Sequence, residues 1–374
     1  MTMGWVSGAA GRLRTLTNRV TSGQRTTAWP RTVPAAVLKG TELIHLGGGE
    51  SLPCPDAERL PLAPSSARMG LGTASLALPP ARVHVLHDAV LYPACRVVMS
   101  PDGRIVAESV TTNMVGRAPL DQAELRSPPI RIDGTVAMFR SPLRSRLNTL
   151  VDHLPRAGLL IHPAMHRVGP ITLVHDGPLT ELESCLLAHL GGRNVRLLQV
   201  DPGTPLRAER VLVPSYVTRP GSGAVPSWYR RWADAVRLGP APAGPRRIFV
   251  DRRATTGHVA TRAELDDVLD RHGVEAVDPS SVAVPELLAM FRASDLVVGM
   301  PGSGMAHCLF SRHSHMVELL RGTTVSPELY YLAACKGLPY DYVPATEDLP
   351  ARDPHRHAVE VDVDWLDSLL KEIG

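Results

Sequence analysis

The feature that most constrains the fold of this chain is a regular alternation of short apolar strands and helices in its C-terminal third. Strands and helices are predicted in turn at 247–251, 261–272, 274–277, 284–293, 295–299 and 302–310. Strands that alternate with helices form βαβ units, and their strands lie parallel in one sheet. We therefore expect residues 245–345 to form a Rossmann-like domain, followed by a strand and a helix in residues 346–374.

A second, less regular alternation occupies residues 142–239. A helix is predicted over 148–160, and strands are predicted near 171–174 and 195–200. Two helices are expected to begin with a capping box, at Thr180 with Glu183 in this block and at Thr261 with Glu264 in the next. The pattern indicates another Rossmann-like domain with a parallel sheet.

The first 141 residues lack this alternation. Three strands are predicted between residues 82 and 110, and the Pro-Asp-Gly turn at 101–103 favours an antiparallel β meander. A polar connector completes the segment 81–141. Residues 1–80 are expected to be an irregular, basic N-terminal region.

Charge, hydropathy and cysteine content exclude several classes of protein. The formal net charge of +3 is too small to indicate a nucleic-acid partner, and the sequence has no apolar run of the roughly 20 residues that span a bilayer. The five scattered cysteines form no disulfide or zinc pattern, which favours the cytoplasm. Residues 1–41 contain six basic and no acidic residues, so 5–20 form either a basic helix with weak peripheral membrane contact or a solvated tail.

A glycine-rich turn, Gly299-Met-Pro-Gly-Ser-Gly-Met, joins a predicted buried strand to a predicted helix. Glycines let the backbone approach a ligand closely, and the free N–H groups at a helix start favour a phosphate. Ligands of open α/β sheets bind at the carboxyl ends of the strands. The turn is therefore either a nucleotide diphosphate site or a purely structural connection. The residues assigned to the site are Gly302, Ser303, Gly304, Met305 and, in the following helix, His307.

Other polar residues follow neighbouring strands. Arg252 and Arg253 come directly after the strand at 247–251, where guanidinium groups match phosphate geometry. Glu318 ends an apolar strand, where its carboxylate can accept hydrogen bonds from ribose hydroxyls. The alternatives are a surface pair with Asp251 for one arginine and a solvent-edge carboxylate for Glu318.

The helix predicted over 148–160 carries the candidates for chemistry. Asn148, Asp152 and Arg156 have i, i+4, i+8 spacing, which places them on one face. Asp152 or the adjacent His153 is a candidate general base for an acceptor hydroxyl, and Asn148 and Arg156 are candidates to line the cleft. The alternative is an ordinary Asp–Arg surface pair.

No metal site is predicted. His162 and His166 lie one helical turn apart, but the sequence places no third ligand. Asp362 and Asp364 imitate an Asp-x-Asp motif, but Asp364 is expected to cap the last helix.

The order and spacing of several segments resemble glycosyltransferase family 61, which is linked to capsular polysaccharide synthesis. The residues that carry the resemblance are Asp152-His-Leu-Pro-Arg156, Arg247-Ile-Phe-Val-Asp-Arg-Arg, Gly302-Ser-Gly-Met-Ala-His-Cys-Leu-Phe and Val317-Glu-Leu. The resemblance covers roughly residues 80–345. It implies a GT-B-like arrangement, in which two Rossmann-like domains face a cleft and the C-terminal domain holds the donor.

The resemblance also implies an activity. Members are inverting transferases that use nucleotide-sugars, often UDP-linked, without an obligatory metal or other cofactor. The acceptor is expected to be a glycan or a small natural product. Matched positions imply that Arg253, Gly302, Gly304 and Glu318 hold the donor.

The chain departs from the usual pattern of the family at Asn148 and Pro301, where the family usually has His, and at His307, where it usually has Asn. A non-catalytic relative that binds or scaffolds is therefore an alternative. A further alternative is another nucleotide-dependent Rossmann enzyme, although neither half has a Gly-x-Gly-x-x-Gly after its first strand.

Overall fold

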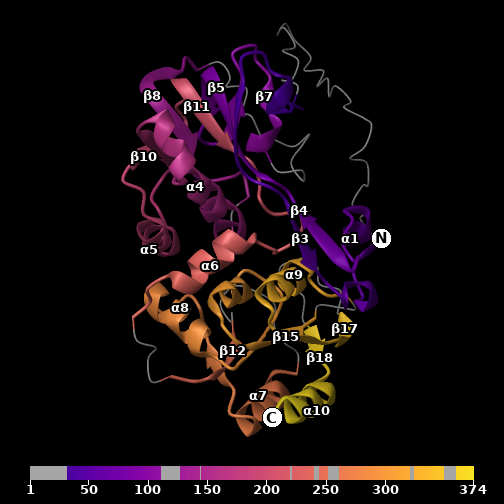
Figure 1. Cartoon of the computed structure of the whole chain (residues 1–374). Helices are drawn as coiled ribbons and strands as arrows, with labels where there is room; N and C mark the ends of the chain where they lie inside the picture. Colours follow the sequence, from indigo (N-terminus) through magenta and orange to yellow (C-terminus); the bar gives the residue numbers. More distant parts are fainter. Residues whose placement is uncertain are drawn as a thin grey trace, which may run out of the picture.

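The computed structural model describes residues 32–110, 127–143, 145–219, 221–239, 244–251, 261–320, 324–348 and 359–374. In these ranges the chain is a mixed α/β protein whose two main sheets have nine and five strands. Figure 1 shows the nine-stranded sheet above, the five-stranded sheet below and a layer of helices between them. None of the described helices is long and apolar enough to cross a bilayer. The predicted basic helix at 5–20 lies outside the described residues.

The five-stranded sheet is parallel throughout, as the sequence predicts for the C-terminal half. Its strands are β12 (Arg247–Val250), β13 (Glu275–Val277), β14 (Leu296–Gly299), β15 (His315–Leu319) and β16 (Tyr340–Val343). Their spatial order is β13-β12-β14-β15-β16. The order reverses between β12 and β14, and such a switch point creates a crevice at the carboxyl ends of the strands.

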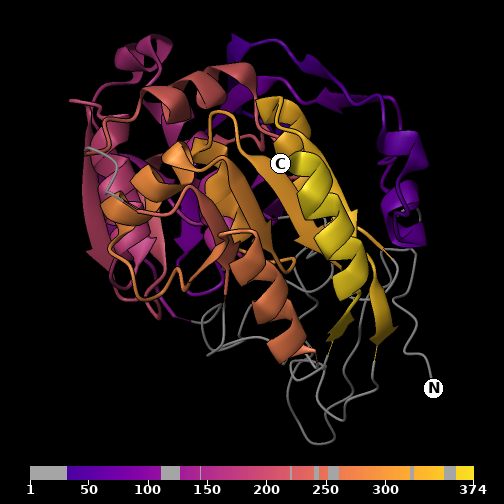
Figure 2. The ribbon, with the colours of Figure 1, turned by 90° about the horizontal axis from the view of Figure 1, so that it is seen from below.

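Helices cover both faces of this sheet because successive side chains of a strand point to opposite sides. Phe249 packs outward with the helices α7 (Arg262–Arg271) and α10 (Val363–Ile373), whereas Ile248 packs inward with α8 (Val284–Ala293). Figure 2 shows α7 and α10 side by side on the outer face. The helix α9 (Pro327–Lys336), which precedes β16, ends at Gly337 in the left-handed conformation.

Two predicted helix caps in this half are wrong. The side chain of Thr261 does not cap α7, because its hydroxyl contacts the backbone N–H of Val361 at 3.3 Å. The cap of α10 is Asp362 rather than Asp364, and its carboxylate accepts from the N–H of Trp365 at 2.9 Å. At α7, a tertiary contact takes up the hydroxyl that was predicted to cap the helix. At α10, the capping residue lies two positions earlier in the sequence than predicted.

The nine-stranded sheet gathers strands that are far apart in the sequence. The main path of the sheet is β1 (Thr32–Val33), β7 (Ile105–Val106), β6 (Val97–Met99), β5 (Ala81–Tyr92), β11 (Leu206–Pro214), β8 (Ile130–Met138), β9 (Ile171–Asp176) and β10 (Val195–Val200). The ninth strand, β2 (Glu42–Gly47), pairs antiparallel with β5. The run β11-β8-β9-β10 is parallel, whereas β5 lies antiparallel to β11. Parallel pairing of β8, β9 and β10 agrees with the βαβ pattern of the middle block.

Two expectations for the first 141 residues need correction. The strands β5, β6 and β7 pair antiparallel, but they continue into the large sheet through β11 rather than preceding it as a separate unit. Residues 130–138, predicted as part of a polar connector, form the central strand β8. The reason is that only the second half of β8 is buried, so its first residues, such as the exposed Ile130, resemble a surface loop in the sequence.

Residues 32–80, expected to be irregular, contribute regular elements as well. Besides β1 and β2 they form the antiparallel pair of β3 (Glu50–Pro53) and β4 (Ser75–Leu78), and the connection between these strands contains the short helix α1 (Pro64–Arg68). This connection reaches the C-terminal half, where the hydroxyl of Tyr331 on α9 accepts from the N–H of Gly72 at 2.7 Å. This N-terminal segment therefore ties the two sheets together.

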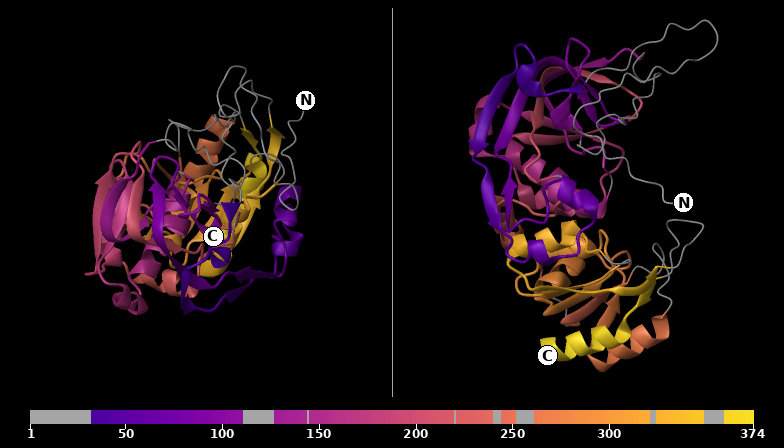
Figure 3. Two further views of the ribbon diagram at one scale, coloured as in Figure 1. Left: turned by 90° about the horizontal axis from the view of Figure 1, so that it is seen from above. Right: turned by 90° about the vertical axis from the view of Figure 1, so that its right-hand side faces the viewer.

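One continuous hydrophobic core joins the two halves, which lie one above the other in the right-hand view of Figure 3. It unites α4 (Leu154–Leu160), α5 (Glu181–Leu190) and α6 (Ser227–Ala235) of the N-terminal half with α8, α9 and the 3₁₀ helix η6 (Met305–Phe310) of the C-terminal half. The backbone of Gly223 lies so close to α9 that a Cβ atom would sit 2.0 Å from the carbonyl oxygen of Glu328. The halves are thus packed against each other, with side chains buried on both sides.

Candidate active site

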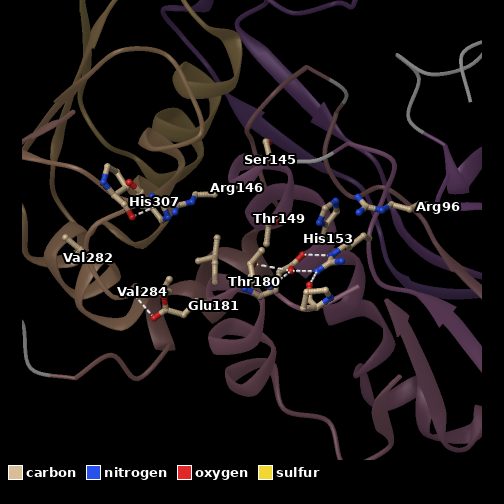
Figure 4. Close-up of a pocket in the computed structure, with 16 residues that line it drawn as sticks. Arg96, Ser145, Arg146, Thr149, His153, Thr180, Glu181, Val282, Val284 and His307 are labelled. Atoms are coloured by element: carbon tan, nitrogen blue, oxygen red, sulfur yellow. Dashed lines mark hydrogen bonds and ion pairs between the residues drawn. The ribbon is translucent and has the colours of Figure 1, made fainter. Parts of the chain in front are cut away.

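A cleft of about 440 Å³ lies where the two halves meet (Figure 4). One wall comes from the segments that follow β8 and β9, and the other comes from the loop at 279–284 and from η6. The strands β8, β9 and β14 all direct their carboxyl ends toward these segments. The cleft therefore occupies the place where ligands bind in open parallel sheets.

The helix on the N-terminal wall contains a π-helical turn. It consists of α3 (Arg146–Asn148), the π-helical segment η4 (Thr149–His153) and α4. Pro155 has no N–H to donate to the carbonyl of Val151, so the regular α-helical hydrogen bond is missing at this point. π turns widen the helix and are frequent at functional sites. The turn carries Asp152 and His153.

The three residues predicted to share a face of this helix have different environments. Asp152 and Arg156 remain close enough for the charge of Arg156 to oppose the rise in the pKa of Asp152. The side chain of Asn148 accepts from the hydroxyl of Ser145 at 2.6 Å and does not line the cleft. Arg156 donates to the carbonyl of Pro214 at 3.1 Å and lies 4.5 Å above the ring of Tyr216. Arg156 is thus part of the packing against β11, rather than of the cleft wall.

Asp152 and His153 are linked by a buried serine. The hydroxyl of Ser141 donates to Oδ2 of Asp152 at 2.7 Å and lies 3.1 Å from Nε2 of His153. The same Nε2 is 3.2 Å from the carbonyl oxygen of Leu143. A carbonyl only accepts, so Nε2 carries the proton and the lone pair of His153 is on Nδ1. In the described part of the chain, neither Nδ1 of His153 nor Oδ1 of Asp152 has a hydrogen-bond partner.

Burial sets the protonation of this group. It raises the pKa of Asp152 to about 6, against the opposing effects of Arg156 and the Ser141 hydrogen bond. It lowers the pKa of His153 to about 3, because the charged imidazolium loses its hydration. Above pH 6, therefore, a buried carboxylate stands behind a neutral imidazole. Of the two side chains, His153 lines the cleft.

A buried ionic network holds this wall in place. Arg96 binds Asp176 at the end of β9 through two nitrogens, with a shortest distance of 2.8 Å, and donates to the carbonyl of Ser141 at 3.0 Å. Arg140, directly after β8, pairs with Glu183 at 2.6 Å. Glu183 also completes the predicted capping box with Thr180, which is confirmed. A paired network of this kind fixes the positions of the side chains that face the cleft.

The opposite wall contributes His307. Its Nδ1 lies 2.8 Å from the carbonyl oxygen of Gly304, and its Nε2 has no hydrogen-bond partner in the described part of the chain. Burial lowers the pKa of His307 to about 4. Figure 4 shows His307 and Arg146 near each other in the cleft. Arg146 reaches from the N-terminal wall and donates to the carbonyl of Pro279 at 3.0 Å.

The glycine-rich turn is present, but its helix differs from the prediction. The turn connects β14 to η6, a 3₁₀ helix of six residues that begins at Met305 rather than an α-helix that begins at Gly302. A Cβ atom at Gly299 would lie 2.6 Å from the sulfur of Met305 and 3.1 Å from Cβ of Val250, so the start of the turn leaves little room for a side chain. Gly302, Ser303, Gly304 and Met305 do not line the cleft, whereas His307 does. So short a helix provides little of the dipole on which the phosphate prediction relied.

The remaining predicted donor residues lie elsewhere. Arg252 and Arg253 fall outside the described residues. Glu318 is buried at the end of β15, accepts from the N–H of Ser326 at 3.1 Å and from the hydroxyl of Tyr340, and does not line the cleft. Burial raises the pKa of Glu318 to about 7. The carboxylate is thus occupied by two donors at the end of β15. One is the backbone N–H at the start of α9, and the other is the hydroxyl of Tyr340 on β16.

Sequence reasoning missed Ser141, Arg96, Arg140 and Arg146. Arg140 and Ser141 follow β8 directly, so recognising that strand would have marked them as residues at a carboxyl end. Arg96 and Arg146 have no comparable local signal, since their roles depend on partners far away in the sequence. No group of three or more His, Cys, Asp or Glu side chains able to hold a metal occurs in the described ranges.

Comparison with known proteins adds an independent finding. Residues 83–317 match the model of the family described as Glycosyltransferase 61. A search of curated proteins finds no match. The matched region runs from β5 to β15 and includes Ser141, Asp152, His153 and His307. The chain therefore belongs to glycosyltransferase family 61.

Proposed function

We propose that this protein is an inverting glycosyltransferase that moves a sugar from a nucleotide-sugar to a hydroxyl group of a glycan or a small natural product. The observation that carries the proposal is the buried Asp152–Ser141–His153 arrangement on the wall of the cleft. In a member of a glycosyltransferase family, the neutral imidazole can take the proton of an acceptor hydroxyl. Burial lowers the pKa of His153 to about 3 and makes it a weak base, so the proposal relies on the carboxylate of Asp152 to stabilise the imidazolium that forms.

The proposal assigns the acceptor to the N-terminal half and the donor to the C-terminal half, in a GT-B-like arrangement. Its support is the position of the cleft at the carboxyl ends of strands from both sheets. Arg252 and Arg253 remain assigned to the donor, since in the sequence they follow β12 at the switch point. The turn at 302–305 does not line the cleft, so its assignment to the donor rests only on its position after β14. No metal or other cofactor is required in this scheme.

The proposed reaction is a single displacement. The acceptor oxygen attacks the anomeric carbon while its proton passes to Nδ1 of His153. The bond between the anomeric carbon and the diphosphate oxygen breaks, and the nucleoside diphosphate leaves from the opposite face, which inverts the configuration. Ser141 links the Nε2–H of the new imidazolium to the carboxylate of Asp152, which stabilises the positive charge. In this scheme His153 is the general base, and Asp152 is the carboxylate that stabilises its protonated form.

The test is turnover of the full chain with UDP-, GDP-, TDP- and CDP-sugars, each with a mixture of glycan and phenolic acceptors. Release of nucleoside diphosphate reports activity, and proton NMR of the product reports the anomeric configuration. Binding is followed separately by the thermal shift that each nucleoside diphosphate produces. Product with inverted configuration supports the proposal, and product with retained configuration contradicts the single displacement. Binding without turnover favours the non-catalytic alternative, and absence of binding contradicts both.

A further inference from the structure

Two side chains that line the cleft, His307 and Arg146, lie near each other. The sequence assigned His307 only generally to a nucleotide diphosphate site, and Arg146 has no assigned role so far. The two come from opposite walls, His307 from η6 and Arg146 from α3. Figure 4 shows the arginine side chain extending toward His307. The pair therefore presents two different polar groups to a ligand at one place.

The hydrogen bonds of His307 determine what it can recognise. The carbonyl of Gly304 only accepts, so Nδ1 of His307 carries the proton, and Nε2 is left with a lone pair. Nε2 is buried and has no partner in the described ranges, and the residue is 1% exposed. A buried acceptor without a partner is costly, so this atom is suited to a ligand group that donates a hydrogen bond.

The ring of His307 is held in this orientation by its surroundings. The ring of Phe291 packs against it with 5.3 Å between centroids. Burial keeps the imidazole neutral, because it lowers the pKa of His307 to about 4, and the nearby charge of Arg146 acts in the same direction. At neutral pH, His307 is therefore a fixed acceptor that does not attract an anion.

Arg146, in contrast to His307, donates hydrogen bonds and carries a positive charge. Its Nη1 donates to the carbonyl of Pro279, and a guanidinium group has five N–H donors in all. The side chain is only half-buried, which leaves donors on the side of the cleft. Guanidinium groups bind phosphate oxygens strongly. Arg146 thus suits an anionic group next to the donor recognised by His307.

The position of the pair indicates which part of a donor substrate it meets. The π-helical segment η4, which carries His153, packs against η6, which carries His307. A group bound at His307 is therefore close to the base proposed for the reaction. In a nucleotide-sugar, the parts nearest the reacting carbon are the sugar hydroxyls and the diphosphate, and the nucleobase lies farther away.

We infer that His307 and Arg146 form a two-part subsite for the transferred sugar, in which a sugar hydroxyl donates to Nε2 of His307 and a diphosphate oxygen accepts from Arg146. The inference rests on the proposed function and adds a determinant of donor specificity to it. It predicts that His307 distinguishes a nucleotide-sugar from the nucleoside diphosphate alone, whereas Arg146 contributes to the binding of both.

The test is isothermal titration of the full chain with the nucleotide-sugar that it binds best and with the matching nucleoside diphosphate. His307→Leu removes the acceptor with little change in volume, and His307→Gln keeps an acceptor oxygen near the position of Nε2. Arg146→Gln removes the charge. His166→Leu is the matched control, because His166 is exposed and lies outside the cleft.

We expect His307→Leu to weaken the nucleotide-sugar about tenfold or more, as loss of a buried hydrogen bond does, and to change binding of the diphosphate less than about threefold. His307→Gln should recover most of the loss, and Arg146→Gln should weaken both ligands about tenfold. Unchanged binding of the nucleotide-sugar by His307→Leu, or an equal loss for both ligands, would overturn the inference and leave the proposed function intact. If the wild type binds neither ligand, the proposed function fails, and the inference fails with it.

Discussion

Each half of the molecule buries one carboxyl group with a raised pKa, and the two groups serve different ends. Asp152 of the N-terminal half has a pKa of about 6 and Glu318 of the C-terminal half has a pKa of about 7, in both cases chiefly because of burial. Within the described residues, one oxygen of Asp152 has no hydrogen-bond partner, and the side chain lies behind His153, which lines the cleft. Glu318 accepts from the start of α9 and from Tyr340, away from the cleft.

The different surroundings of Asp152 and Glu318 show that a raised pKa alone does not identify a catalytic group. Both carboxyl groups lose hydration to a similar degree, so the pKa values are alike. What separates them is the connection to the cleft, which Asp152 reaches through Ser141 and His153. The following four tests probe this contrast, and they are ordered from the largest expected effect to the smallest.

The largest effect is expected for Asp152→Asn, which keeps the shape of the side chain and removes its charge. Turnover should fall by about 100-fold or more, because the imidazolium formed on His153 loses its supporting carboxylate. The pKa of Asp152 is raised in the folded state, so its contribution to stability is present at low pH and is lost as the pH rises through about 6. The variant should therefore be more stable than the wild type at pH 7.5, by about 2–3 kcal/mol.

Steady-state kinetics and urea unfolding at several pH values measure both effects. The control is Asp133→Asn, since Asp133 is exposed on β8 in the same half. Wild-type turnover of Asp152→Asn would contradict the role proposed for Asp152. A loss of stability at pH 7.5 would instead show that the charge is well solvated or paired.

A smaller effect on turnover is expected for Ser141→Ala. The variant removes the link between Asp152 and His153 but leaves the carboxylate, so kcat should fall by about 10- to 100-fold while KM stays within about threefold. The Ser141 hydrogen bond lowers the pKa of Asp152, so without it the acidic limb of the pH–rate profile should move to higher pH. Ser314→Ala is the matched control, because this buried serine of the C-terminal half donates to the carbonyl of Ser294 at 2.6 Å. A fall in kcat without movement of the limb would indicate a packing role only.

Glu318→Gln completes the comparison from the other half. Turnover and nucleotide binding should stay within about threefold of the wild type, because losing a group that does not contact the ligand leaves transition-state binding intact. The contribution of Glu318 to stability is lost as the pH rises through about 7, so the variant should gain about 3 kcal/mol at pH 8 and less than about 1 kcal/mol at pH 5. Thermal unfolding across this pH range gives the stability. A tenfold loss of nucleotide binding would restore the ribose role that the sequence predicted for Glu318.

The smallest effects concern helix caps in the two halves. Thr180→Ala removes a cap whose partner Glu183 is also paired with Arg140, whereas Asp362→Ala removes an isolated cap on the last helix. Each should cost about 1 kcal/mol, with the larger cost at Thr180 because the cap is part of a buried network. Urea unfolding of both variants gives the difference. Equal costs would mean that the network holds Glu183 in place without the cap.

The sequence by itself determined the C-terminal half and the family. The strands at 247–250 and 296–299 and the helices over 284–293 and 327–336 follow from local periodicity and end signals, because each βαβ unit is formed by neighbouring residues. The motifs that resembled glycosyltransferase family 61 also lie within short segments, and the match over residues 83–317 confirmed the family. Local information was sufficient wherever the interacting residues were close in the chain.

Only the tertiary structure decided the nine-stranded sheet and the cleft. The strand β8 is recognisable by its partners β9 and β11 rather than by its own half-exposed sequence. Ser141, His153 and His307 come from three separate segments, and only the folded chain brings Ser141 within hydrogen-bond distance of both Asp152 and His153. Local sequence patterns cannot predict the free energy gained when distant segments pair, because that free energy depends on contacts that exist only once the chain has folded.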